Sequence, residues 1–74
     1  MEKINYSDAV RLVEREGAKV WHVHAPEGIC YVICKEMPVI NDAFLVVRIP
    51  DRFAKNPRIY SSADYYRGWF WWSA

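Results

Sequence analysis

Residues 19–35 read KVWHVHAPEGICYVICK and predict a β-hairpin, the element around which the rest of the chain is arranged. The stretch from Lys19 to His24 alternates as a strand does, with its two histidines on one face and Trp21 on the other. Residues 25–28, Ala-Pro-Glu-Gly, suit a type I turn, which favours proline at its second position and glycine at its fourth. Ile29 to Lys35 is then expected to return as the second strand.

The segments on either side of the hairpin predict a helix and a further strand. Asn5 to Glu16 has apolar residues at the three- and four-residue spacing of one helical face. Asn5 or Ser7 can act as the N-cap, and Gly17 stands where a helix ends. Ala43 to Ile49 is the most apolar stretch, so it is expected to form a central strand covered by the helix.

Turn signals and short motifs divide the last 25 residues. Pro50 to Pro57 is predicted to be a loop with one helical turn at Asp51 to Lys55. Ser61-Ser62-Ala63-Asp64 matches a helix-capping signature, so a second short helix is expected from Ser62 to Arg67. Trp69 to Trp72 is predicted to close the sheet as its last strand.

The fold class predicted from these elements is α+β: an N-terminal helix packed on an antiparallel sheet of about four strands, with a short second helix before a C-terminal aromatic strand. The composition agrees, because eight Val and six Ile stand against two Leu and β-branched residues favour strands. At 74 residues, the chain is expected to be a single domain, residues 1–74.

The charge pattern narrows the classes of partner. The net charge is +1, which argues against a nucleic-acid partner. Residues 39–74 carry five basic and three acidic groups, a mild excess that suits a small anionic ligand. The first residues do not resemble a signal peptide, and no apolar stretch is long enough to span a membrane. We therefore expect a cytoplasmic protein without membrane association, with reduced cysteines.

The end of the chain is unusually aromatic, with seven aromatic residues between Tyr60 and Trp72. A domain of this size buries only about 60% of the surface that its unfolded chain exposes, so it is poorly placed to hide them all. Trp69, Trp71 and Trp72 therefore predict either a subunit interface or a platform on which a flat ligand stacks. We expect a homo-oligomer, and a pocket between subunits would combine the two interpretations.

The residues that usually carry metal binding or catalysis are few. His22 and His24 leave the same face of a strand roughly 6.5–7 Å apart, which suits a zinc ion only if a third ligand is supplied. Cys30 and Cys34 lie roughly 13 Å apart along a strand, too far for a disulfide, and are expected to be small core residues. No nucleophile or phosphate-loop motif is present. We expect no metal, no cofactor and no enzymatic activity.

Two kinds of group can contact a phosphate. Arg48 and Arg58 can form bidentate hydrogen bonds, and the helix that begins at Ser62 has backbone N–H groups at its N-terminus. For either arginine, a solvated surface charge is the alternative interpretation.

The two ends of the chain resemble a known family. Asn5-Tyr6-Ser7-Asp8-Ala9-Val10, Gly17, Lys19-Val20 and residues 28–33 resemble the opening of the small phage Thoeris anti-defence sponge proteins, and residues 61–69 resemble their C-terminal end. Val23-His24-Ala25-Pro26 stands where that family has Arg-x-Gly-Trp. The resemblance implies an oligomeric phage protein that binds a cyclic ADP-ribose-type immune signal and sequesters it without cleavage.

In such a sponge, a tryptophan would stack on the ligand's ring, while arginine and helix-start amides would contact its phosphates. The predicted ligand-binding residues are Trp21, His24, Arg48, Arg58, Ser62, Trp69 and Trp71. The alternative from another class is a protein–protein inhibitor of a host or defence enzyme, of the anti-CRISPR kind, that docks through its aromatic C-terminus. A module that stacks RNA bases on its aromatic rings is the third hypothesis.

Overall fold

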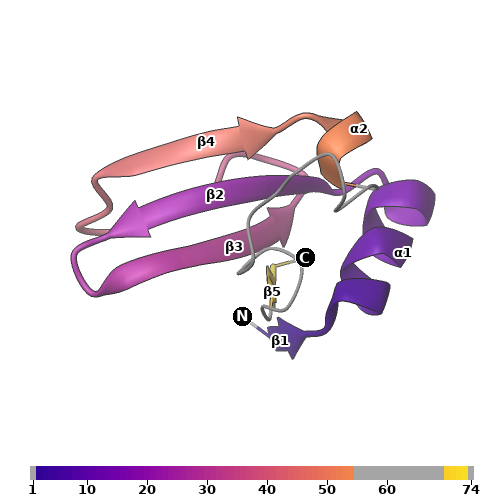
Figure 1. The fold of residues 1–74 in the computed structure, drawn as a ribbon, viewed down its shortest axis with the longest axis horizontal. Helices are drawn as coiled ribbons and strands as arrows, with labels where there is room; N and C mark the ends of the chain where they lie inside the picture. The colour runs from indigo at the N-terminus through magenta and orange to yellow at the C-terminus, as the bar shows by residue number, and fades with distance from the viewer. Residues whose placement is uncertain (1, 55–69, 74) are drawn as a thin grey trace.

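The computed structural model describes residues 2–54 and 70–73, which form one sheet with a helix packed on it (Figure 1). The elements in chain order are β1 (Glu2–Ile4), α1 (Tyr6–Glu16), β2 (Lys19–Ala25), β3 (Gly28–Cys34), β4 (Leu45–Ile49), α2 (Asp51–Ala54) and β5 (Phe70–Trp72). The α+β class and the N-terminal helix are confirmed. The sheet has five strands instead of about four, and it is mixed because β5 runs parallel to β3.

Helix α1 begins and ends at the residues that its sequence indicates. The Asn5 side chain accepts a hydrogen bond of 2.9 Å from the Asp8 backbone N–H, so Asn5 is the N-cap. Gly17 ends the helix in the left-handed conformation, at φ 69°, which favours glycine. Ala9 and Val13 are the buried residues of its apolar face.

The predicted hairpin is confirmed as strands β2 and β3. Their register runs from Lys19 opposite Cys34 to Ala25 opposite Gly28, so Pro26 and Glu27 form the turn. The predicted helical turn after Pro50 is α2, and the C-terminal strand is β5. The second helix predicted at Ser62 to Arg67 lies outside the described residues.

The order of the strands, β1-β5-β3-β2-β4, corrects two predictions. Strand β4 lies at an edge instead of the centre, because among its apolar side chains only Ile49 is buried while Leu45 and Val47 are 51% and 44% exposed. Strand β5 lies between β1 and β3 instead of closing the sheet. The three-residue strand β1 was not predicted, and it takes the edge position beyond β5.

The sheet has a buried cluster on each face. On the side of α1, which we call the helix face, the cluster contains Ile4, Ala9, Val13, Ala18, Val20, Tyr31, Ile33, Ile49 and Phe70. On the opposite side, which we call the far face, Val23, Val32 and Cys34 form a smaller cluster. Ile40 and Ala43, from the segment between β3 and β4, pack against it. Within the described residues, no helix is long and apolar enough to cross a membrane.

Candidate functional site

One row of residues crosses all five strands on the far face. Backbone pairing aligns Lys3 with Trp71, Trp71 with Val32, Val32 with Trp21 and Trp21 with Arg48. Residues paired in this way project to the same side of a sheet, and Val32 belongs to the far-face cluster. The row therefore places two tryptophans on the far face with a basic residue at each end.

A groove opens beside this row, between the tip of the hairpin, the segment after β3 and strand β5. Its volume is about 460 Å³, within the range of small-molecule sites. We call it the hairpin groove. It is lined by Val23, Ala25, Glu27, Gly28, Ile29, Cys30, Val32, Ile40 and Trp71. These side chains are apolar except for the Glu27 carboxylate and the Cys30 thiol, so the groove suits a largely apolar or aromatic group.

Trp71 is the aromatic residue of the groove, and the rest of the described aromatic tail has another role. Phe70 is fully buried in the helix-face cluster, with its ring 5.5 Å from that of Tyr31 and 6.1 Å from that of Tyr6. Trp72 is half-buried against the same cluster. Trp71 points the other way and remains 37% exposed. Among the three described aromatic residues of the tail, the fold therefore covers Phe70, half-buries Trp72 and leaves Trp71 beside the groove.

The groove has charge of opposite sign at its two ends. Glu27 belongs to the hairpin turn and lines one end. Lys3 is aligned with Trp71 across the β1–β5 pair and lies beyond the other end. An anionic ligand is therefore favoured at the end near Lys3 and disfavoured at the end near Glu27.

Cys30 is a free, half-buried thiol in the groove wall. Burial raises its pKa, and the negative charge of Glu27 raises it further. The thiol is therefore protonated at neutral pH and adds to the apolar character of the wall. Cys34 is buried, donates a hydrogen bond of 2.8 Å to the Glu36 carbonyl and packs in the far-face cluster. Cys34 is a buried core residue, as predicted, whereas Cys30 is half-buried beside the far-face cluster, in the wall of the groove.

Trp21 and Arg48 lie in the same row as Trp71 but make other contacts. The Trp21 indole N–H donates a hydrogen bond of 3.2 Å to the Cys34 carbonyl, which ties the ring to strand β3. Arg48 is three strands from Trp71, about 14 Å between Cα atoms by strand spacing, and it contacts the Asp51 carboxylate at 3.5 Å. Neither residue lines the hairpin groove.

Asp51 is held by two cations. Its carboxylate accepts a hydrogen bond of 3.0 Å from Lys19 and one of 3.5 Å from Arg48. The hydrogen bond from Lys19 is the main cause that lowers the pKa of Asp51, and Arg48 lowers it further. These contacts join α2 to β2 and β4, so the charge of Arg48 is partly neutralised within the chain.

His24 lies on the helix face, away from the groove. Its Nε2 and the Nδ1 of His22 share a hydrogen bond of 3.2 Å, and the His22 ring stacks on Tyr31 with centroids 4.8 Å apart. The pair is thus used in packing and hydrogen bonding on that face. Within residues 2–54 and 70–73, no three potential metal ligands of the His, Cys, Asp and Glu types gather at one place.

The structure thus brings only part of the predicted site together. Trp71 lines the groove, Trp21 and Arg48 lie farther along the same row, and His24 is on the opposite face. Arg58, Ser62 and Trp69 lie outside the described residues. Sequence reasoning missed Glu27, Cys30 and Ile40 as groove residues. The hairpin register could have indicated Cys30, since it places that residue opposite Val23.

Comparison with known proteins assigns no family. No protein-family model, curated protein or solved structure matches this chain.

Proposed function

We propose that this protein binds a small ring-containing ligand of the cyclic-nucleotide kind in the hairpin groove and sequesters it without chemical change. The observation that carries the proposal is the indole of Trp71, part exposed on the wall of an open apolar groove of about 460 Å³. Stacking on an indole is sequence-tolerant and is worth about 1–3 kcal/mol per base. The resemblance of the chain's ends to the phage Thoeris anti-defence proteins suggests a cyclic ADP-ribose-type signal as the ligand.

The charges around the groove give the proposed orientation. The ring lies against Trp71, and the anionic part extends towards Lys3 and away from Glu27. Lys3→Ala is therefore expected to weaken binding roughly tenfold, since a hydrogen bond to a charged group contributes about 1.5 kcal/mol or more. Glu27→Gln is expected to strengthen it, because the change removes a like charge without altering the size of the side chain.

Calorimetric titration of the purified chain with cyclic ADP-ribose isomers and cyclic dinucleotides tests the proposal. We expect one of them to bind and to be recovered intact, by chromatography, after the complex is heat-denatured. Recovery of a cleaved product would contradict sequestration. Failure of every ligand to bind the folded chain would remove the nucleotide proposal and favour the protein-inhibitor alternative.

A further inference from the structure

The two walls of the hairpin groove stand over strands that are two places apart in the sheet. Strand β3 lies between β5 and β2, and its buried Val32 belongs to the floor of the groove. Trp71, on β5, forms one wall. Because neighbouring strands lie about 4.8 Å apart, the backbones of β5 and β2 are separated by about 9.6 Å across the groove.

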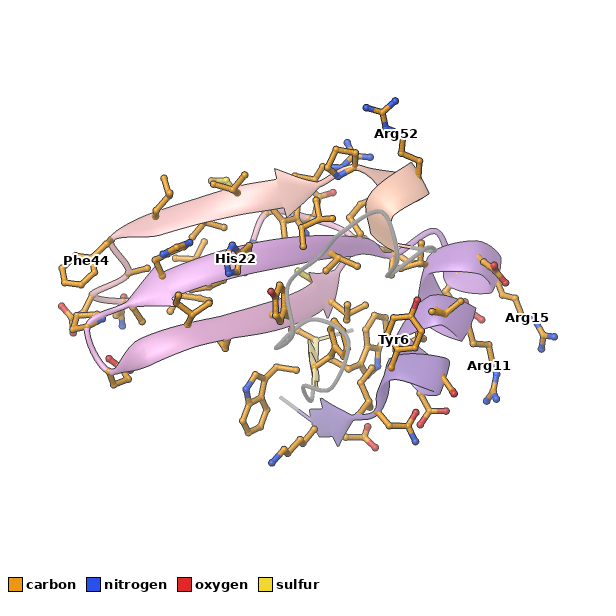
Figure 2. The ribbon with its side chains drawn as sticks, viewed as in Figure 1. Tyr6, Arg11, Arg15, His22, Phe44 and Arg52 are labelled. Atoms are coloured by element: carbon orange, nitrogen blue, oxygen red, sulfur yellow. The ribbon has the colours of Figure 1, made fainter. Side chains whose placement is uncertain are left out.

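Ile40 forms the opposite wall. It belongs to residues 35–44, which connect the end of β3 to the start of β4 and therefore cross β2, since β2 lies between those strands. The crossing is on the far face, where Ile40 packs against the far-face cluster. At the end of the segment, the Phe44 N–H donates a hydrogen bond to the His24 carbonyl of β2, and Figure 2 shows Phe44 at the end of the sheet where β4 begins. Ile40 is thus held over β2, across β3 from Trp71.

The separation of the walls decides how many rings the groove admits. A flat ring with an apolar wall on each face needs two contacts of about 3.5–4 Å, or about 7–8 Å between the walls. Two rings stacked on each other need a third contact, which brings the total to about 10.5–12 Å. A separation of about 9.6 Å is enough for one ring and too small for two.

We infer that the hairpin groove is a slot for one flat ring, held between the indole of Trp71 and the side chain of Ile40. The inference rests on the proposed function and gives its ligand class: a nucleotide whose single base has both faces free. A nucleotide with two bases stacked on each other leaves one free face on each base, so neither base can contact both walls. Ile40 is therefore the residue that determines this specificity, because Trp71 alone, as an open platform, would bind either class.

Nuclear magnetic resonance of the wild-type chain with cyclic ADP-ribose isomers as probes tests the slot. The base protons of a bound isomer should show nuclear Overhauser effects to both the Trp71 indole and the Ile40 methyl groups. Effects to Trp71 alone, or preferential binding of a cyclic dinucleotide, would overturn the slot while the proposed function stands. If no ligand of either class binds, the proposed function itself fails, and the slot fails with it.

Calorimetry with variants of the segment measures what Ile40 contributes. Ile40→Ala should weaken binding of the cyclic ADP-ribose isomer roughly tenfold, because the base loses apolar contacts on one face. Ile40→Leu keeps an apolar wall of the same volume and should bind nearly as the wild type does. The control, Val39→Ala, changes a neighbouring side chain that is 95% exposed and does not line the groove, and should leave the affinity unchanged. An Ile40→Ala chain that is folded by circular dichroism and binds as tightly as the wild type would overturn the inference.

Discussion

Replacing Phe70 by alanine tests the unexpected position of the C-terminal strand, inside the sheet between β1 and β3. The Phe70 side chain is fully buried and contacts Tyr31 on β3 and Tyr6 on α1. Truncating a buried phenylalanine costs about 3–5 kcal/mol. At about 0.05–0.15 kcal/mol per residue, the whole 74-residue chain has a free energy of unfolding of only about 4–11 kcal/mol. The substitution should therefore remove about a quarter of the free energy of unfolding or more.

Urea unfolding followed by far-UV circular dichroism measures the effect. Because Phe70→Ala can leave the chain largely unfolded, Phe70→Leu serves as the milder variant, with an expected loss of about 1–1.5 kcal/mol. At a slope near 1 kcal/mol per molar urea, its midpoint should fall by about 1 M. Met37→Ala changes a large but 60% exposed side chain and should stay within about 0.5 kcal/mol of the wild type. A Phe70→Ala chain as stable as the Met37→Ala control would show that the strand is not inserted in the sheet.

Three further outcomes follow from the contacts described above. Asp51→Asn should destabilise the chain by up to about 1 kcal/mol at neutral pH. Because the folded-state pKa of Asp51 is lowered, the carboxylate stabilises the fold above its unfolded-state pKa of about 4, and this stabilisation is lost as the pH falls. The urea unfolding curves of the wild type and the variant should therefore converge in acid. Cys30 should react slowly with iodoacetamide at pH 8 and faster as the pH rises, because its pKa is raised. A ligand in the groove should slow the reaction further, and mass spectrometry of the labelled chain measures both effects. Gly17→Ala should lower the free energy of unfolding by about 1–2 kcal/mol in urea titration, from backbone conformation alone, because an added Cβ meets no atom within 4 Å.

Local patterns in the sequence predicted the elements well and their arrangement less well. The helix limits depend on Asn5 and Gly17, and the hairpin depends on alternation and a short turn, so neighbouring residues determine both. The position of β4 depends on long-range pairing: β5 and β1 add to the sheet on the side of β3, while β4 pairs with β2 and stays at the edge instead of the predicted centre.

The candidate site was predicted in part for the same reason. The aromatic composition of the C-terminus pointed to Trp71, but composition does not tell which ring of a strand faces the core. Phe70 and Trp72 alternate with Trp71 and are turned towards α1. Arg48 was predicted to contact a phosphate because of its side-chain chemistry. In the fold, its guanidinium forms an ion pair with the carboxylate of Asp51 instead. Ile40 lines the groove because the irregular segment between β3 and β4 packs against the far face. Such a segment has no helical or strand periodicity from which its buried side chains could be predicted.

The most direct test of the central claim is a calorimetric comparison of Trp71→Ala with the wild type, using cyclic ADP-ribose isomers as ligands. Loss of stacking should weaken binding about fivefold to 150-fold. The control, Phe44→Ala, removes an aromatic ring that is 76% exposed and does not line the groove, and should bind as the wild type does. Equal affinity of the wild-type and Trp71→Ala chains would show that the ligand does not lie against Trp71 in the hairpin groove.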